Sequence, residues 1–459
     1  MTNTREQQLI ARIAELGAEN QVLRARIADL EQQVSKLLGR PTSPPKSPIP
    51  GFVKPNRQKR RRKKPGQKPG HAGSYRHRPT KADEIVNIPI KDCPHCHGVI
   101  ENITTHQQYV EEVIPAQTKV ICYQTQRGYC PSCQRQVESH HPQQIPHRLI
   151  GSRALLIAAE LKHAMGVPYR KVAAVLKRLC GLSVTAGALA QSMQSLAKWF
   201  TPEYQAIQTG LRQSHCTYVD ETGWRLNGQS CWLWAFTTDS YTLYEVNASR
   251  GHQVVLEQLS ADYDGVVVSD FYTAYNPLPY TQQKCLVHLL RELSEVRKTN
   301  HTQEYAAFAK KLTRLLRDAI RLKQKQSDFT QSTLERRFKR LTCRLEELAK
   351  ADYHDSDCQR LAKRLAKHSD SLFTFLSHMQ VSTDNNRAER AIRPAVITRK
   401  ISGGNRSPKG SEALGIITSV IQTCKQQNKD FVEVGLEIIR RYHQGLDAGV
   451  LTVETTAPT

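Results

Sequence analysis

The sequence predicts a multidomain protein whose largest domain is of the α/β class, a mixed sheet with flanking helices, preceded by smaller N-terminal modules. Three observations indicate this organisation. Apolar residues recur with a period of 3.5 through residues 1–40, strand periodicity replaces helical periodicity at Cys216, and helical periodicity returns over residues 286–380. The length of 459 residues allows about three domains.

The composition is strongly basic, with 66 Lys and Arg against 42 Asp and Glu and a formal net charge of +24. Such an excess favours a polyanionic partner, either nucleic acid or an anionic membrane surface. A membrane is disfavoured, because no apolar run approaches the roughly 18 residues that a span needs and the N-terminus lacks a secretion signal. We therefore expect a soluble, cytoplasmic, nucleoid-associated protein whose cysteines are thiols or metal ligands rather than disulfides.

Residues 1–40 predict a leucine-zipper coiled coil. The a and d positions of the heptads are Leu9, Ile13, Leu16, Asn20, Leu23, Ile27, Leu30, Val34 and Leu37. Leu at d and β-branched residues at a favour a parallel two-stranded coiled coil, and a single Asn at an a position sets the register. We expect a homodimer or higher oligomer through this segment. The alternative is one amphipathic helix packed on its own protein.

Residues 41–82 predict a disordered basic arm, with nine prolines, thirteen Lys or Arg and no acidic residue. Seven of the eight residues 57–64 are basic. The candidate DNA-binding residues of this run are Arg60, Arg61, Arg62, Lys63 and Lys64. Binding to phosphates through such an arm is sensitive to salt. The alternative is a linker that only keeps the protein in solution.

Residues 83–149 predict a zinc-binding ribbon. Two Cys-x-x-Cys pairs place four thiolates on tight turns, an arrangement that closes a tetrahedral Zn²⁺ site. The expected ligands are Cys93, Cys96, Cys130 and Cys133. Zinc with four protein ligands is structural, because catalytic zinc keeps an open position. Incidental thiols are the alternative, and other side chains stay open as substitute ligands: Cys122, His95 and His97.

Residues 150–210 predict a helical region with a helix-turn-helix outline. Periodicity indicates helices over residues 170–179 and 189–199, with a turn at Gly181 and a capping residue at Ser183. The second helix would enter the major groove of DNA. Ordinary helical packing is the alternative.

The pattern from Cys216 onward predicts a sheet. Strands are expected at residues 216–220, 231–238, 241–246 and 265–270, with a helix near residues 252–259. The first three strands form a meander, because Asn227-Gly228 suits the positive φ angles of a tight hairpin turn. Asp220 and Asp270 end two of the apolar strands, at the edge where an α/β sheet opens to ligands.

Carboxylates at such an edge are either bonded structurally or hold a cation, and Mg²⁺ or Mn²⁺ prefers their oxygens. A third acid, Glu389, lies in a basic segment with helical periodicity, so guanidinium groups suited to phosphate share its face. A basic, glycine-bearing loop follows at residues 399–409. The candidate DNA contacts in these two segments are Arg390, Arg393 and Lys400.

Three motifs carry a resemblance to a known family. They are YVDETGW at residues 218–224, VSDFY at 268–272 and NNRAERAIRP at 385–394. These motifs follow, in this order, the zipper, a basic arm with a Lys-Pro-Gly-His sequence and the two Cys pairs. In this arrangement the chain resembles the bacterial insertion-sequence transposases of the IS66 family, which are of the DDE type. The resemblance spans nearly the whole chain.

The resemblance implies an RNase H-like catalytic domain with Asp220, Asp270 and Glu389 as the ligands of Mg²⁺ or Mn²⁺. The expected boundaries are 211–285 and 381–445 for this domain, 286–380 for an all-α insertion and 446–459 for a disordered tail. Two bound cations would catalyse phosphodiester cleavage and strand transfer. The implied partners are double-stranded DNA, as element ends and target, and companion proteins of the same element.

Smaller hypotheses and rival functions stay open. Trp224 resembles aromatic residues that stack on a flipped base, with packing in the hairpin as the alternative. Cys285 and His288 form a Cys-x-x-His pair that is either functional or a packing contact. The rival functions are a non-enzymatic, zinc-containing DNA-binding protein and an RNase H-like nuclease derived from a transposase. The acids at strand ends favour the transposase.

Overall fold

The computed structural model divides the chain into two units, residues 1–111 and 112–459, and each is described by itself. The described residues are 3–37, 79–89, 91–93, 95–111, 116–139, 145 and 149–452. Within these ranges, none of the helices combines the length and the apolar character that crossing a membrane requires.

The first unit begins with a single long helix, α1 (Asn3–Leu37), which is 35 residues long. The helix predicted for this segment is therefore confirmed. Three of its d-position side chains lie open to solvent, since Leu16, Leu23 and Leu30 are 42%, 56% and 47% exposed. Pairing of two such helices in a coiled coil stays a prediction.

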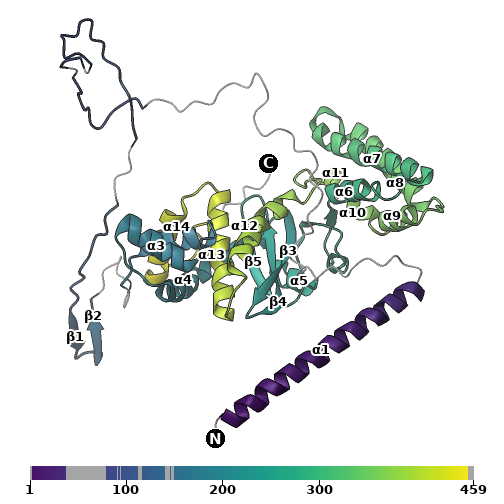
Figure 1. The fold of residues 1–459 in the computed structure, drawn as a ribbon. Coiled ribbons are helices and arrows are strands. Elements are labelled where there is room, and N and C mark those ends of the chain that lie inside the picture. The colour runs from purple at the N-terminus through teal and green to yellow at the C-terminus, as the bar shows by residue number, and fades with distance from the viewer. Residues whose placement is uncertain are drawn as a thin grey trace. The chain divides into compact units, whose positions relative to one another are not determined.

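The second unit contains a five-stranded mixed sheet with the strand order β5-β4-β3-β6-β7. Figure 1 labels three of its strands, β3, β4 and β5. Its strands are β3 (Cys216–Leu226), β4 (Gln229–Thr237), β5 (Thr242–Asn247), β6 (Val266–Ser269) and β7 (Gln282–Lys284). The first three form an antiparallel meander, whereas β6 runs parallel to β3 and to β7. The predicted mixed α/β core is confirmed, including the hairpin turn, where Asn227 and Gly228 have φ of 49° and 80°.

The two faces of the sheet carry separate clusters of buried side chains, as strand alternation requires. On one face, Val219 and Phe236 pack with α4 (Ala186–Arg212) and α13 (Pro408–Gln426). The short helix α5 (Gln253–Leu259) belongs to this same cluster. On the other face, Tyr218 and Val268 pack with helices that follow β7. The sheet is thus covered by helices on both faces.

Two helices precede α4 in the second unit, α2 (Ser152–His163) and α3 (Tyr169–Cys180). The predicted turn exists, because α3 ends at Gly181 with φ of 70°. Thr185 rather than Ser183 caps α4, accepting a hydrogen bond from the backbone N–H of Ala188. Since α4 buries residues along its whole length in the cluster that it shares with α13 and one face of the sheet, it is a core helix. Reading of a DNA groove by α4 stays a prediction.

The chain after α14 (Phe431–Gln444) is fastened to the core. The backbone N–H groups of three residues donate to the buried Glu203 carboxylate: Gly449 at 2.9 Å, Val450 at 3.1 Å and Leu451 at 2.7 Å. The predicted disordered tail begins at residue 446, whereas residues 449–451 are held in place, because a carboxylate distant in the sequence accepts hydrogen bonds from their backbone. Residues 453–459 lie outside the described part of the chain.

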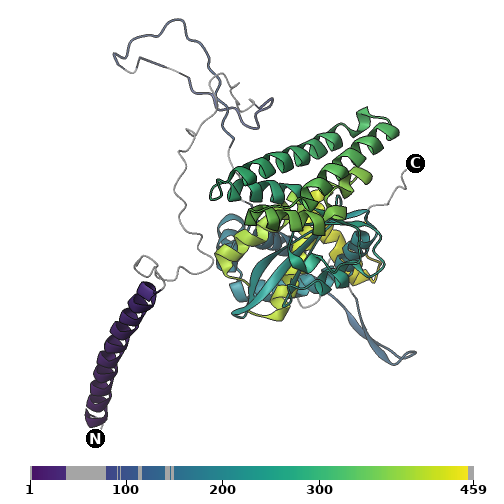
Figure 2. The same cartoon turned by 90° about the vertical axis from the view of Figure 1, so that its right-hand side faces the viewer.

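Only helices and short 3₁₀ turns occur between β7 and α12 (Asn386–Ser402). They are α6 (Leu286–Val296), α7 (Gln303–Gln324), α8 (Gln331–Lys350), α9 (Ser356–Lys367), α10 (Ser369–Leu372) and α11 (Thr374–Ser377). Buried side chains such as Leu312, Leu345 and Leu361 join them to one another and to the sheet. Figure 2 shows these helices stacked beside the sheet.

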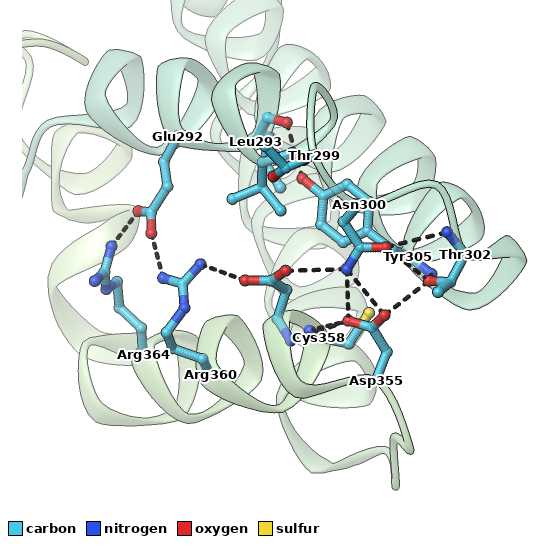
Figure 3. Close-up of polar contacts among 12 residues, drawn as sticks. Glu292, Leu293, Thr299, Asn300, Thr302, Tyr305, Asp355, Cys358, Arg360 and Arg364 are labelled. Atoms are coloured by element: carbon cyan, nitrogen blue, oxygen red, sulfur yellow. Dashed lines mark hydrogen bonds and ion pairs between the residues drawn. The ribbon is translucent and has the colours of Figure 1, made fainter. Parts of the chain in front are cut away.

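A polar network braces the insertion where the chain enters α7 and α9 (Figure 3). The Asn300 side-chain amide donates to both Asp355 oxygens, at 3.1 and 2.9 Å, and Thr302 donates to Asp355 at 2.7 Å. Asp355 also caps α9 by accepting the backbone N–H groups of Asp357 and Cys358. These hydrogen bonds, that from Asn300 above all, lower the pKa of Asp355 to about 2.

Replacing Asp355 by Ala removes the cap and should lower the free energy of unfolding by about 1 to 2 kcal/mol at pH 7. Because the pKa of Asp355 is lower in the folded than in the unfolded chain, this contribution exists above pH 4 and is lost as pH falls toward 2. Urea unfolding of both proteins at pH 7, 4 and 3 measures the difference. The exposed Asp352 provides the control substitution to Ala, and a gap between wild type and Asp355→Ala that widens in acid would contradict the assignment.

Candidate active site

The sheet brings Asp220 and Asp270 to the same register position. The last pair of the parallel β3–β6 ladder joins Tyr218 to Val268, and each aspartate lies two residues beyond its member of that pair. Asp270 follows the last residue of β6, as predicted. Asp220 does not end its strand, because β3 continues to Leu226 through its pairing with β4.

The third predicted acid, Glu389, enters from the first turn of α12. Burial above all, together with the negative charges of Glu221, Asp270 and Glu389, raises the pKa of Asp220 to about 7. Asp270 and Glu389 therefore both lie within electrostatic reach of Asp220. Glu389 Oε1 is buried without a hydrogen-bond partner, and His288 Nε2 lies 3.6 Å from it.

The chemistry of this acid cluster fits a divalent cation. Its donors are carboxylate oxygens, which Mg²⁺ and Mn²⁺ prefer, and one of them is a buried acceptor without a donor. As the side chains stand in the described residues, no three His, Cys, Asp or Glu form a group that could hold a metal ion. Carboxylates without a cation repel one another, so their approach to ligand distances needs the cation itself.

Asn385 fixes the helix that carries Glu389. It immediately precedes α12, and its buried side-chain amide donates to the backbone oxygen of Val219 at 2.8 Å. Its own N–H donates to the sulfur of Cys285 at 3.2 Å. The start of α12 is thereby tied to β3 one residue before Asp220. Sequence reasoning missed this role, because an Asn before a helix is typical of an ordinary cap.

The basic residues of α12 separate into two groups, and the three predicted DNA contacts all fall in the first. Arg390, Arg393 and Lys400 are exposed, and their spacing places them near one side of the helix. Other arginines of this helix serve the fold instead, since Arg387 binds Asp239 and Arg399 donates to Thr222 at 3.0 Å. An exposed basic surface therefore lies on the same helix as Glu389.

Trp224 lies in the hairpin as a packing residue. Its side chain is only 3% exposed, and its indole N–H donates to the side-chain oxygen of Asn405 at 2.8 Å. The packing alternative therefore describes Trp224 in this structure. Stacking on a base would require the side chain to leave this environment.

The Cys-x-x-His pair contributes to the acid cluster in two ways. Cys285 is buried and accepts the Asn385 N–H described above, so it helps to hold α12. His288 reaches the carboxylate of Glu389, and its Nδ1 is buried without a hydrogen-bond partner. This contact makes His288 a neighbour of the acid cluster.

The two Cys-x-x-Cys motifs adopt similar turns, one in each unit. In the first, the N–H of His97 donates to the oxygen of Cys93 at 2.8 Å, and backbone hydrogen bonds from His95 and Cys96 lower the pKa of Cys93. The second turn joins β1 (Arg127–Cys130) to β2 (Arg135–Glu138). There hydrogen bonds from Cys133, and then from Ser132, lower the pKa of Cys130.

The residue after the second cysteine has a positive φ in both turns, 59° at His97 and 52° at Gln134. Backbone N–H groups that point at a sulfur favour its thiolate form, which is the form that binds zinc. Because the turns belong to different units, the single four-cysteine site stays a prediction. The basic run 57–64, with its five predicted DNA contacts, lies outside the described residues.

The chain is similar to known proteins over the region that contains this site. The model of a family described as "Transposase IS66 family" matches residues 147–413. The chain is 23% identical over 410 residues to an uncharacterized protein of Sinorhizobium fredii, y4jD, covering 82% of this chain and 79% of that protein. A second uncharacterized protein of that organism, y4qI, is 25% identical over 334 residues, 64% of this chain and 60% of its own length.

Repulsion within the acid cluster predicts an effect on stability. Replacing Asp220 by Asn removes one partly buried charge, so the metal-free protein should gain about 2 kcal/mol in its free energy of unfolding. The same change should abolish the rise in melting temperature that Mn²⁺ causes in the wild type. Calorimetry with and without Mn²⁺ measures both effects, with Asp262→Asn as an exposed control on the same domain. A Mn²⁺ response that survives in Asp220→Asn would show that the cation binds elsewhere.

Proposed function

Because the chain belongs to the IS66 transposase family, we propose that it binds the ends of its insertion sequence and catalyses metal-dependent cleavage and strand transfer into target DNA. The convergence of Asp220, Asp270 and Glu389 from three distant segments carries this proposal. A non-enzymatic DNA-binding protein has no need of such a cluster, since partly buried carboxylates that repel one another cost stability.

The proposed mechanism assigns a role to each part of the site. Asp220 and Asp270 on the sheet and Glu389 on α12 would hold divalent cations, Mg²⁺ or Mn²⁺. Once bound, such cations would supply activation of the attacking oxygen and stabilisation of the leaving oxygen of a phosphodiester. Asn385 keeps α12 in place while the DNA backbone is exchanged. With water or a DNA 3′-hydroxyl as attacker, the same residues serve cleavage and joining.

The surroundings of the site support DNA as the substrate. Arg390, Arg393 and Lys400 expose positive charge on α12, where phosphates next to the cleaved bond can be bound. The basic run 57–64 would add a sequence-independent, salt-sensitive contribution. The mixed sheet with helices on both faces supports the RNase H-like architecture that the family resemblance implies.

We propose that α1 pairs with a second copy of the chain. Its leucines at d positions are largely exposed on the single helix, and burying them in a coiled coil would remove apolar surface from water. A dimer suits a reaction that pairs two element ends. Companion proteins of the same element are proposed as further partners.

The central prediction concerns the chemistry. In a strand-transfer assay with labelled element-end DNA, a plasmid target and Mg²⁺, Asp270→Asn and Glu389→Gln should each lower cleavage and joining by at least about a hundredfold. Binding of the element end should stay within a few fold, because phosphate contacts provide most of the affinity. The matched controls are Asp262→Asn and Glu257→Gln, both exposed acids of the same domain.

Equal loss of binding and cleavage would contradict the assignment of these acids as metal ligands. Wild-type binding without cleavage, in Mg²⁺ or Mn²⁺, would favour a regulator or a missing companion. Adding the companion proteins then separates these two explanations, since only a transposase gains joined product.

Zinc is proposed as a structural cofactor held by Cys93, Cys96, Cys130 and Cys133. Metal analysis of the purified chain should find one Zn²⁺ per chain, and replacing Cys93 or Cys130 by Ser should lower this content by half or more. The control is Cys343→Ser, an exposed cysteine of α8. Unchanged zinc in the Cys93 and Cys130 variants would refute the site.

A further inference from the structure

Glu221, the residue after Asp220, points to the opposite face of the sheet, as alternation along β3 requires. Its side chain is only 3% exposed, in a region of apolar neighbours that includes Val219 and Trp234. Burying a carboxylate is unfavourable unless specific partners compensate. The presence of Glu221 at this place therefore needs a reason beyond packing.

The compensation comes from two partners that occupy both carboxylate oxygens. Arg250, in the loop after β5, donates to Glu221 Oε1 through Nε at 2.9 Å and contacts the same oxygen through Nη2 at 2.8 Å. The hydroxyl of Tyr275 donates to Oε2. Both carboxylate oxygens of Glu221 are engaged, and they lie on the face of the sheet opposite to Asp220. Glu221 is therefore placed to hold neighbouring residues in position and not to bind a metal ion.

The guanidinium of Arg250 is held between two aromatic rings. It lies 4.2 Å from the ring centre of Trp232 in β4 and 3.8 Å from that of Tyr272. A flat guanidinium that stacks on two rings and directs two nitrogens at one carboxylate oxygen cannot be replaced by lysine without losing these contacts. Arg250 thus joins β3, β4 and the loop that follows β6.

That loop is the one that carries Asp270. The backbone N–H of Tyr272 donates to Asp270 Oδ1 at 2.8 Å, while the Tyr272 ring rests on Arg250. Tyr275, in the 3₁₀ turn Thr273–Tyr275, closes the connection to Glu221. The contacts therefore run from the neighbour of Asp220, through Arg250, to the residue that orients Asp270.

We propose that Glu221 and Arg250 are positioning residues that set the separation of Asp220 and Asp270 for divalent-cation binding. The inference rests on the proposed function, because it concerns the same metal site. Some residues do not bind a metal ion themselves but hold its ligands in place through hydrogen bonds. Removing such a residue typically lowers the metal affinity by ten- to a hundredfold. A residue needed only for folding would change the amount of active protein and not its affinity for the cation.

The test is calorimetric titration of the full-length protein with Mn²⁺. Glu221→Gln and Arg250→Lys should each weaken Mn²⁺ binding about tenfold. In strand transfer, the half-saturating Mn²⁺ concentration should rise by a similar factor, while the rate at saturating Mn²⁺ falls by less than about threefold. If Glu221→Gln fails to fold, Tyr275→Phe replaces it in the test, because this change removes only one hydrogen bond to Glu221. It should likewise weaken Mn²⁺ binding.

The matched control is Glu245→Gln in β5. Glu245 is also a partly buried carboxylate of this sheet, and it accepts hydrogen bonds from Asn247 at 2.9 Å and Gln258 at 2.6 Å. Neither Asn247 nor Gln258 belongs to the loop that carries Asp270, so the Mn²⁺ affinity of the Glu245→Gln variant should equal that of the wild type. Wild-type affinity in Glu221→Gln and Arg250→Lys, or equal weakening in Glu245→Gln, would overturn the inference. A wild-type protein that neither binds Mn²⁺ nor cleaves DNA would refute the proposed function, and the inference with it.

Discussion

The parallel pairing of β3 with β6 is the constraint on which the rest of this structure depends. Because Tyr218 pairs with Val268, the residues two positions later, Asp220 and Asp270, leave the ladder together at one edge of the sheet. A shift of one residue in either strand would move one carboxylate to the opposite face. Such a shift would also move the buried valines of β6 from one packed face of the sheet to the other, away from the side chains that they now contact. The backbone positions of Asp220 and Asp270 are thus set by the hydrogen bonds of the ladder and by apolar packing.

The third acid is brought to this edge by a different kind of contact. More than 110 residues separate Asp270 from Glu389, and helices fill the interval. Those helices share buried side chains with the sheet, so the chain returns to a defined place. The Asn385 amide then binds the backbone of Val219, which orients α12 against β3. Stability of the insertion and assembly of the site are therefore coupled through the same core.

Much of this arrangement is visible in the sequence, for physical reasons that differ between residues. Asp220 and Asp270 follow apolar strand patterns, and Asn227-Gly228 specifies its turn locally. Strand β7 was missed, because three residues, Gln282–Lys284, are too short for a periodic signal. The roles of Asn385 and Arg250 depend on partners far away in the chain, and so does the ordering of residues 449–451 by Glu203. Such long-range polar contacts leave no local pattern.

The site holds partly buried carboxylates that repel one another on a sheet and a helix fixed by the surrounding core. This combination is expected where a bound cation offsets the negative charge. The most direct test is a crystal structure of the full chain grown with Mn²⁺ and element-end DNA, with anomalous diffraction to locate the ions. The account predicts anomalous peaks bounded by oxygens of Asp220, Asp270 and Glu389, with a DNA phosphate beside them. Ordered DNA together with Mn²⁺ peaks only at other places would contradict it.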